Sequence, residues 1–441
     1  MLLSKLKHKL NNDGHLKDLL KGSAITFVLK MSGMGLGFIL TYLISHKLGP
    51  EGVGFYNLML QVLMVLGMVL GLGMNISVLR YVGQFDNEND RPKMHNLYRY
   101  FVSTVGPLSV VVSVILYFAA GWVTSMIGKE PEYAQGLRWV AIVLPFFTIN
   151  QISVEFIRGL KKLQISELVR SVLRPLVIIL GILLVFQDSL SKMDVIYLLV
   201  IALVINSLVS RWAIWNSLRK VEKKQSDFNL KELLHTSFPM MITGVSLSLI
   251  TATPIVFLDM YTTQSDVGVY SVAVRLAGLV SLVLVVVNTI SAPKFAQLFW
   301  AKKRDELQRL INQASGIMFW TALFLCMVLM LGAEFWLGLF GAEFKRGKWV
   351  LIPLLLGQLA NAATGSVGVM MNMSGYQKKL RNIIVFSSVT SVMMMIAIGT
   401  NINIVLTAII FASVNAFISI YAAYVLFRIE RIKTFYMPFL K

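Results

Sequence analysis

The stretch GPEGVGFYNLML at residues 49–60 returns in a related form as SDVGVYSVAV at residues 265–274, and an apolar segment follows each copy. A shift of 214 residues aligns the Val-Gly-x-Tyr pattern of the two copies, which places Val53, Gly54 and Tyr56 on Val267, Gly268 and Tyr270. We expect each copy to start the second helix of a lobe at the outer membrane face. There the glycine permits a tight turn after a short loop and the tyrosine anchors the membrane interface. The alternative is a helix-start signal that the chain uses twice without a structural repeat.

The composition of the chain favours a membrane protein. Of its 441 residues, 56% are hydrophobic, and the mean hydropathy is +0.71, whereas soluble domains average about 45–50% apolar residues. Because roughly 20 apolar residues span a bilayer as a helix, the apolar segments predict an all-α integral membrane protein with about 12 transmembrane helices. The predicted segments are residues 22–45, 54–79, 101–125, 139–157, 172–188, 194–215, 238–260, 268–293, 311–333, 350–373, 383–399 and 403–427.

The basic residues are distributed unevenly between the two sides of the membrane. With the N-terminus inside, 32 of the 41 lysine and arginine residues fall in predicted cytoplasmic segments and 7 in external loops. This asymmetry predicts that both termini are cytoplasmic. The net charge of +19 is therefore mostly a topology signal. Its dispersal over many short loops argues against nucleic-acid binding.

The helix count and the repeat together predict two pseudo-symmetric six-helix bundles with the same orientation. We expect an N-terminal lobe at residues 1–215, a polar and basic cytoplasmic linker at 216–237, and a C-terminal lobe at 238–441. A basic amphipathic segment on the inner membrane surface precedes the first helix. A cleft between two such lobes is the usual place for the substrate of a transporter.

Three stretches resemble a known family. LGPEGVGFYNLMLQVLMVLGMVLGLGMNISVLRYV (48–82) resembles the first-repeat signature of polysaccharide biosynthesis flippases, the O-antigen or Wzx-type proteins. DVGVYSVAVRLAGLV (266–280) resembles their second repeat, and LLLGQLANAATGSVGVMMNMSGYQKK (354–379) resembles their tenth-helix region. These flippases share a superfamily with the multidrug and toxin (MATE) exporters.

The resemblance implies a MATE-like transporter and not an enzyme. Its expected activity is flipping of an undecaprenyl-diphosphate-linked oligosaccharide, such as an O-antigen unit for lipopolysaccharide biosynthesis, across the cytoplasmic (inner) membrane. The expected partners are this lipid-linked oligosaccharide, membrane lipids, a polysaccharide polymerase and a chain-length regulator, and no nucleic acid. No catalytic residue, cofactor or metal is expected, and proton or sodium coupling is the candidate energy source.

Lys30 and Arg275 are the cations inside predicted membrane segments, where a charge costs at least about 2.5–3.5 kcal/mol. We expect both to face a wet cavity and contact an anionic substrate. The alternatives are snorkelling for Lys30 and a structural pair with Asp259 for Arg275. Gln61, which the repeat aligns with Arg275, and Arg174, at the inner end of the fifth helix, complete the predicted substrate-binding set. Arg174 is equally well explained as a positive-inside residue.

Two carboxylates are candidates for binding a coupling proton or sodium ion. Asp259 lies near the outer end of the seventh predicted helix, where such a residue more often caps a helix or pairs locally. Glu155 lies three residues before Arg158, so an ion pair on one helix face is the simpler interpretation.

Motifs for enzymatic chemistry are missing from the sequence, which has no Walker A motif, nucleophile elbow or metal-spaced His/Cys cluster. The Gly-rich stretch GMGLG at residues 33–37 does not follow a strand. It therefore predicts close helix packing and not nucleotide binding.

Two other classes of function remain open. A multidrug exporter of the same fold would favour cationic drugs and place carboxylates in its cavity. A membrane enzyme is the other class: a polysaccharide polymerase would usually carry a long external loop, and an acyltransferase would need a catalytic histidine with an acidic partner. The longest external loop, residues 334–349, is short, and all five histidines lie at ends or in loops.

Overall fold

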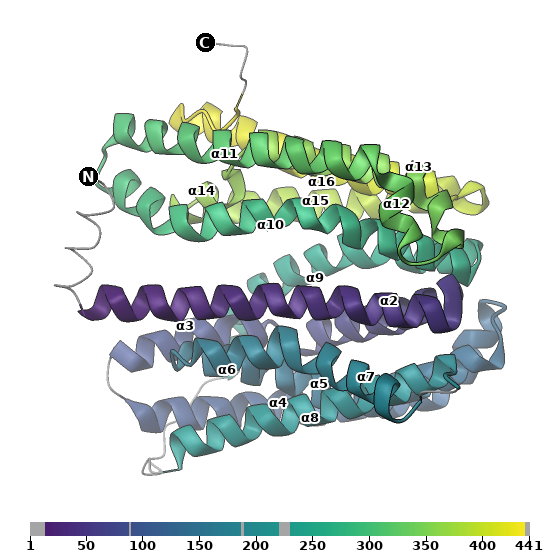
Figure 1. Ribbon diagram of the computed structural model, residues 1–441. Coiled ribbons are helices and arrows are strands. Elements are labelled where there is room, and N and C mark those ends of the chain that lie inside the picture. Colours follow the sequence, from purple (N-terminus) through teal and green to yellow (C-terminus); the bar gives the residue numbers. More distant parts are fainter. Residues whose placement is uncertain (1–13, 88–89, 187–188, 220–229, 437–441) are drawn as a thin grey trace. The chain divides into compact units, whose positions relative to one another are not determined.

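The computed structural model describes residues 14–87, 90–186, 189–219 and 230–436. Residues 1–13 of the predicted N-terminal segment and residues 220–229 of the predicted linker lie outside this part. The described chain is helical and contains no strand, so the prediction of an all-α protein is confirmed (Figure 1).

The chain divides into two compact units. Unit 1 comprises Met1–Leu43 and Val62–Ile242, and unit 2 comprises Ile44–Gln61 and Thr243–Lys441. The predicted lobes follow the chain without interruption, whereas each unit contains a short segment from the other half of the sequence. The lobe boundaries therefore stay a prediction, and the units are used below.

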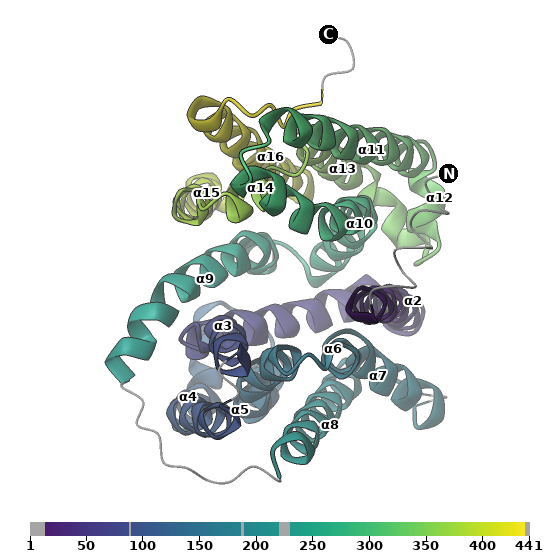
Figure 2. The ribbon, with the colours of Figure 1, turned by 90° about the vertical axis from the view of Figure 1, so that its left-hand side faces the viewer.

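Unit 1 is built around the long helix α5, which packs on α3, α4 and α8, while α7 packs on α8 (Figure 2). Its buried core includes Phe101 and Phe156, both fully shielded from solvent. The elements are α2 (Gly14–Leu70, shared with unit 2), α3 (Met74–Asn87), α4 (Arg91–Met126), α5 (Pro131–Gly159), α6 (Leu163–Glu167), the π-helical turn η1 (Leu168–Val172), α7 (Leu173–Leu184) and α8 (Lys192–Leu218).

In unit 2, α10 and α11 pack on α13, which also packs on α16, and α16 packs on α15 (Figure 2). The elements are α9 (Leu230–Tyr261, shared with unit 1), α10 (Gln264–Trp300), α11 (Arg304–Leu331), α12 (Ala333–Gly338), the 3₁₀ turn η2 (Ala342–Gly347), α13 (Lys348–Ala363), α14 (Val367–Met373), α15 (Gln377–Ile398), the 3₁₀ turn η3 (Gly399–Asn401) and α16 (Ile404–Glu430).

The described helices agree with a multi-pass membrane protein. Nine are long and apolar enough to cross a membrane, or ten when the bent pair Ala342–Ala363 and Val367–Met373 is taken as one span. The first, Ile25–Leu70, has 46 residues. At 1.5 Å per residue it is about 69 Å long, more than twice the roughly 30 Å of a hydrocarbon core. A break at Gly49, where φ is 64°, divides it into two spans. The structure therefore fits approximately twelve spans, and the exact number remains a prediction.

The repeated Val-Gly-x-Tyr pattern brings two helices into backbone contact within unit 2. A side chain on Gly54 would collide with the backbone oxygen of Gln264, and one on Gly268 would collide with that of Pro50. The members of each pair differ by 210 or 218 residues in sequence, and the contact is reciprocal about the repeat. The glycines thus allow two α-helices to cross closely, while the turn is made by Gly49.

The predicted interface role of the two tyrosines is wrong. Tyr56 is 4% exposed and Tyr270 is 1% exposed, so neither side chain reaches a membrane interface. Both rings belong to the buried core at the close helix crossing. Because the crossing brings backbones together, the large neighbouring side chains are enclosed on both sides.

Candidate functional site

Each unit contains a polar cavity of its own. The unit 1 cavity has a volume of about 340 Å³ and the unit 2 cavity about 450 Å³. Both volumes fall in the range of small-molecule sites, roughly 300–1,000 Å³. All residues that line the first belong to unit 1, and all that line the second belong to unit 2.

The unit 1 cavity combines charged groups with side-chain amides. Helix α5 contributes Glu155, and the neighbouring η1 and α7 contribute Arg170 and Arg174. The amides come from the three helices α3, α5 and α8, while α2 contributes an apolar part of the wall. They belong to Asn75, Asn150, Gln151 and Asn206.

A π-helical turn positions the two arginines. The N–H of Leu173 bonds to the carbonyl of Leu168, five residues earlier, instead of the usual four. Pro175 follows and has no N–H with which to continue the α-helical pattern toward Ser171. Such turns occur often at functional sites, and this one carries Arg170 while leading into Arg174.

Close packing of α2 accommodates the distorted turn. A side chain on Gly33 would lie 2.6 Å from the backbone oxygen of Ser171, so only a glycine leaves room for the turn. The prediction that the Gly-rich stretch serves helix packing is confirmed at Gly33. Nothing lies within 4 Å of the corresponding point on Gly35.

The carboxylate in the unit 1 cavity is neutralised by two arginines. Arg170 Nη2 lies 2.5 Å from Glu155 Oε1, and Arg158 Nη1 lies 3.6 Å from Glu155 Oε2. The predicted Glu155–Arg158 pair is thereby confirmed. Arg174 differs, because its Nε is buried with no hydrogen-bond partner in the described structure. The three charged lining residues carry a net positive charge, and Arg174 is the group left to bind an anion.

The amides of the unit 1 cavity also keep unused capacity. Asn75 Nδ2 donates to Gln151 Oε1 at 3.1 Å, and Asn206 Nδ2 donates to the carbonyl of Val169 at 3.2 Å. The Oδ1 atoms of Asn75 and Asn206 are buried and accept no hydrogen bond within the described chain. Unpaired buried acceptors are costly, so these atoms favour a ligand or water in the cavity.

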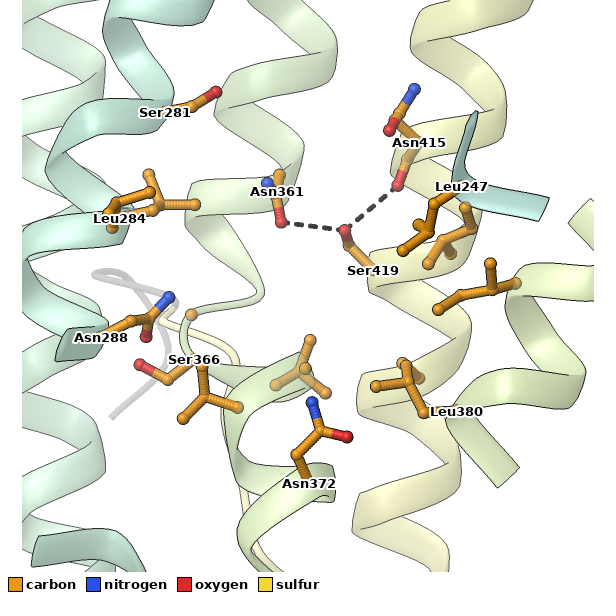
Figure 3. A pocket seen from close by; sticks show the side chains of 18 of the residues that line it. Leu247, Ser281, Leu284, Asn288, Asn361, Ser366, Asn372, Leu380, Asn415 and Ser419 are labelled. Atoms are coloured by element: carbon orange, nitrogen blue, oxygen red, sulfur yellow. Dashed lines mark hydrogen bonds between the residues drawn. The ribbon is translucent and has the colours of Figure 1, made fainter. Parts of the chain in front are cut away.

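The unit 2 cavity is neutral. Among the described residues that line it, polar groups are asparagine amides and serine or threonine hydroxyls, and none is charged (Figure 3). Residues on both sides of the break between α13 and α14 line this cavity. At this break Gly365 has φ 67°, and a side chain there would meet Ser315 and lie 2.8 Å from the carbonyl of Thr434.

The two cavities occupy corresponding places in the repeat. Five pairs of lining residues are separated by the same 214 positions that relate the two Val-Gly-x-Tyr copies. The pairs are Phe147 and Asn361, Gln151 and Gly365, Val154 and Gly368, Glu155 and Val369, and Arg170 and Ile384. The ion pair of unit 1 is therefore replaced by two aliphatic side chains in unit 2.

Two of the predicted site residues, Arg174 and Glu155, come together in the unit 1 cavity. Four others line neither of the two cavities: Lys30 and Gln61 on α2, Asp259 on α9 and Arg275 on α10. Asp259 is 3% exposed, and both it and Arg275 interact with other groups of the protein. The substrate-binding or coupling roles of these four remain predictions.

Sequence reasoning missed Arg170 and the amides. Arg170 precedes Arg174 by four residues, a spacing that places two side chains on one helix face. That spacing could have identified Arg170 beforehand. The amides gave no such signal, because single asparagines on separate helices have no common spacing in sequence. Among the described residues, no group of three or more His, Cys, Asp or Glu side chains is placed to hold a metal ion.

Comparison with known proteins extends this description. A family model described as polysaccharide biosynthesis protein matches residues 19–299. Stage V sporulation protein B of Bacillus subtilis (strain 168) is 22% identical over 158 residues, which are 35% of this chain and 30% of that protein. The chain thus matches less than a third of that relative's length.

Solved structures show the same fold. The inward-facing conformation of a multidrug resistance MATE family transporter of the MOP superfamily is 16% identical, with 93% of this chain and 98% of that one covered and a TM-score of 0.75. A MOP superfamily transporter from Pyrococcus furiosus, for which a binding pocket of reverse polarity is described, is 17% identical, with 93% and 95% covered and a TM-score of 0.63. At these identities the likeness establishes a MATE-like transporter fold.

Proposed function

Because the chain belongs to the polysaccharide biosynthesis protein family, we propose that it flips an undecaprenyl-diphosphate-linked oligosaccharide, such as an O-antigen repeat unit, across the cytoplasmic membrane. The movement would proceed by alternating access, with both termini on the cytoplasmic side as the charge distribution favours. The diphosphate would enter a cationic site, while the polyprenyl chain stays in lipid.

Arg174 is the observation that carries this proposal. Its Nε is buried at a cavity wall without a hydrogen-bond partner in the described part of the chain, although a guanidinium in such a place normally pairs. A phosphate oxygen would satisfy it, and the planar guanidinium suits phosphate geometry. The unused acceptors of Asn75 and Asn206 would remain for hydroxyl groups or water.

The charge of the same cavity argues against an exporter of cationic drugs. Such an exporter would present a free carboxylate, whereas both oxygens of Glu155 face arginines. This pairing also disfavours Glu155 as the ligand of a coupling sodium ion. Coupling through Asp259, and contact of the substrate with Lys30, Gln61 and Arg275, stay part of the proposal.

The test is a flipping assay with purified protein in proteoliposomes, using a fluorescent undecaprenyl-diphosphate-linked disaccharide. Arg174→Ala should lower the flipping rate about tenfold or more, because a hydrogen bond to a charged group is worth about 1.5–3 kcal/mol. Arg174→Lys should recover only part of the rate, since the bidentate geometry is lost.

The matched control is Arg309→Ala, which removes an exposed arginine on α11. It should flip at the wild-type rate. Equal rates for Arg174→Ala and Arg309→Ala, at equal amounts of folded protein, would remove Arg174 from the substrate path and with it the support for this function.

A further inference from the structure

The unit 2 cavity has a chemistry that the diphosphate does not explain. Four asparagines line it, Asn288 on α10, Asn361 on α13, Asn372 on α14 and Asn415 on α16, together with several hydroxyl groups (Figure 3). They come from four different helices and converge on one space. The rest of the wall is aliphatic.

These amides are only partly used by the protein. Ser419 Oγ donates to Asn361 Oδ1 at 3.0 Å (Figure 3), and Asn415 Nδ2 donates to the carbonyl of Phe411 at 2.8 Å. Within the described chain, the Nδ2 group of Asn361 donates no hydrogen bond and the Oδ1 atom of Asn415 accepts none.

The other two asparagines have still more unused capacity. The Oδ1 atom of Asn288 is buried without any partner in the described structure, and neither Asn288 nor Asn372 uses its side chain in a hydrogen bond with described residues. A buried acceptor without a partner costs about 1–3 kcal/mol unless water or a ligand satisfies it. The cavity therefore offers several hydrogen-bond donors and acceptors that a ligand or water can satisfy.

This set fits a neutral polyhydroxylated ligand. A hydroxyl group both donates and accepts, and so does a carboxamide. A cationic drug would need a carboxylate and a phosphate would need a cation, and the described lining supplies neither. A polyprenyl chain would leave the amides unsatisfied at a cost.

The corresponding cavity of unit 1 strengthens this assignment. Where unit 1 has Glu155 and Arg170, unit 2 has Val369 and Ile384, and where unit 1 has Phe147, unit 2 has Asn361. At equivalent positions the second cavity thus has no charges, and its amide at Asn361 stands in place of the unit 1 amide at Gln151, whose counterpart is Gly365. The two cavities therefore differ in the charge of their lining as well as in volume.

We propose that the unit 2 cavity is a saccharide-binding site that holds one or two sugar residues by hydrogen bonds from these asparagines. The inference deepens the proposed function and rests on it in assigning these sugars to the lipid-linked substrate. Asn288 is a principal contact because its Oδ1 atom is buried without a partner among the described residues, and Asn361 is the other because it replaces Phe147 of unit 1.

The first experiment needs no lipid-linked substrate. In full-length protein carrying Cys326→Ser, Ser281→Cys places a thiol in the cavity wall, and its alkylation by N-ethylmaleimide is followed with and without methyl glycosides. The panel contains the methyl glycosides of glucose, galactose, mannose, rhamnose, N-acetylglucosamine and N-acetylgalactosamine. At least one should slow alkylation about tenfold near saturation, while Ser125→Cys, at an exposed position of unit 1, reacts at an unchanged rate.

Asparagine variants then identify the contacts. Asn361→Ala and Asn288→Ala should each weaken the protecting glycoside about tenfold. Asn382→Ala, which removes an exposed amide on α15 outside the cavity, should leave protection unchanged. Unfolding temperatures of all variants check that the fold is intact.

The second experiment separates this inference from the proposed function by comparing undecaprenyl diphosphate with its glycosylated form in the flipping assay. We expect Asn361→Ala and Asn288→Ala to slow only the glycosylated lipid, and Arg174→Ala to slow both. If a glycoside protects Ser281→Cys but neither lipid is flipped, the saccharide site stands and the flippase function fails. If both lipids are flipped and no glycoside protects, or the asparagine variants slow both lipids equally, the saccharide site is refuted.

Discussion

The unit 1 and unit 2 cavities are lined by corresponding helices that differ in where they are distorted. In unit 1 the helix α5 is continuous, and the chain is distorted later, at the π turn that carries Arg170. In unit 2 the equivalent of α5 is broken at Gly365 into α13 and α14, while α15 runs without a break. The two units thus distort different helices beside their cavities, and unit 1 also breaks the equivalent of α10 between α2 and α3, where Leu72 and Gly73 have positive φ.

The position of the distortion decides which side chains reach the cavity. The π turn brings two arginines to the wall of the unit 1 cavity, where Arg170 contacts Glu155 and the Nε atom of Arg174 has no partner among the described residues. The break in unit 2 separates Asn361 from Asn372 and turns both toward one space (Figure 3). Corresponding helices can therefore line a charged cavity in one unit and a neutral cavity in the other, through local backbone changes.

The largest expected effect tests whether the unit 1 cavity depends on its π turn. Gly33→Ala should lower the free energy of unfolding by about 2–3 kcal/mol, because the new methyl group meets the backbone of Ser171 and overpacking costs about 1–3 kcal/mol in addition to lost contacts. Thermal unfolding in detergent measures the change, and the flipping assay should show a parallel loss as Arg174 is displaced.

Gly35→Ala is the matched control in the same helix. Nothing lies near its added methyl group, and alanine favours a helix over glycine by about 1 kcal/mol, so stability should stay equal or rise. The residue of unit 2 that corresponds to Gly33 is Leu247, which lines the unit 2 cavity, where α15 has no π turn. An unchanged free energy of unfolding for Gly33→Ala would show that the π turn does not need the space left by the glycine.

A smaller effect tests whether the ion pair is the feature that distinguishes the cavities. Glu155→Val alone should cost about 1–2 kcal/mol, because it leaves Arg170 without its partner; the exposure of the pair, 20% and 38%, keeps the cost below that of a fully buried bridge. The double variant Glu155→Val with Arg170→Ile installs the residues of unit 2 and should recover most of this stability.

The double-mutant cycle gives the coupling directly. Flipping should remain impaired in the double variant, because the unit 1 cavity then lacks two of its three charged groups. A coupling free energy below about 0.5 kcal/mol between the two substitutions would mean that the pair is a surface contact. The contrast between the cavities would then rest on Arg174 alone.

The sequence predicted those features that depend on short spacing or on composition. Apolar runs located the helices, the three-residue spacing located the Glu155–Arg158 pair, and Gly33 was correctly assigned to close packing. Burial of Tyr56 and Tyr270 was missed, since a tyrosine at a helix start has the same pattern whether it faces lipid headgroups or another helix.

The cavities could not be predicted because they depend on backbone irregularities. A π turn shifts every later side chain around the helix axis, and no periodicity in the sequence records that shift. The asparagines of unit 2 lie on helices up to about 130 residues apart in the chain. Their convergence is a consequence of packing, which local patterns do not contain.

The smallest expected effect concerns a contact at one end of each cavity's helices. In unit 1, Lys162 Nζ donates to Ser217 Oγ at 2.8 Å. In unit 2 the corresponding contact joins the Tyr376 hydroxyl, which donates, to the carboxylate of Glu430, and Arg304 lies 2.9 Å from the same carboxylate. Each contact joins the residue just before α6 or α15 to the end of α8 or α16. Only the second contact pairs a phenol with a carboxylic acid.

Tyr376→Phe should therefore lower stability by about 1 kcal/mol at pH 7, and the effect should depend on pH. The hydrogen bond to Glu430 is the main cause that raises the pKa of Tyr376 above its usual value of 10.0, followed by burial. A raised folded-state pKa means that the protonated phenol stabilises the fold. This contribution is complete below the pKa of the unfolded state and is lost as the pH rises through the pKa of the folded state.

The difference in unfolding temperature between wild type and Tyr376→Phe should be constant from neutral pH to about pH 9 and shrink above about pH 10. A Lys162→Met variant, in which the unit 1 contact is removed, keeps Tyr376 and should retain the wild-type loss of stability above that pH. A gap between wild type and Tyr376→Phe that stays constant into the alkaline range would show that the phenol is not held protonated by Glu430.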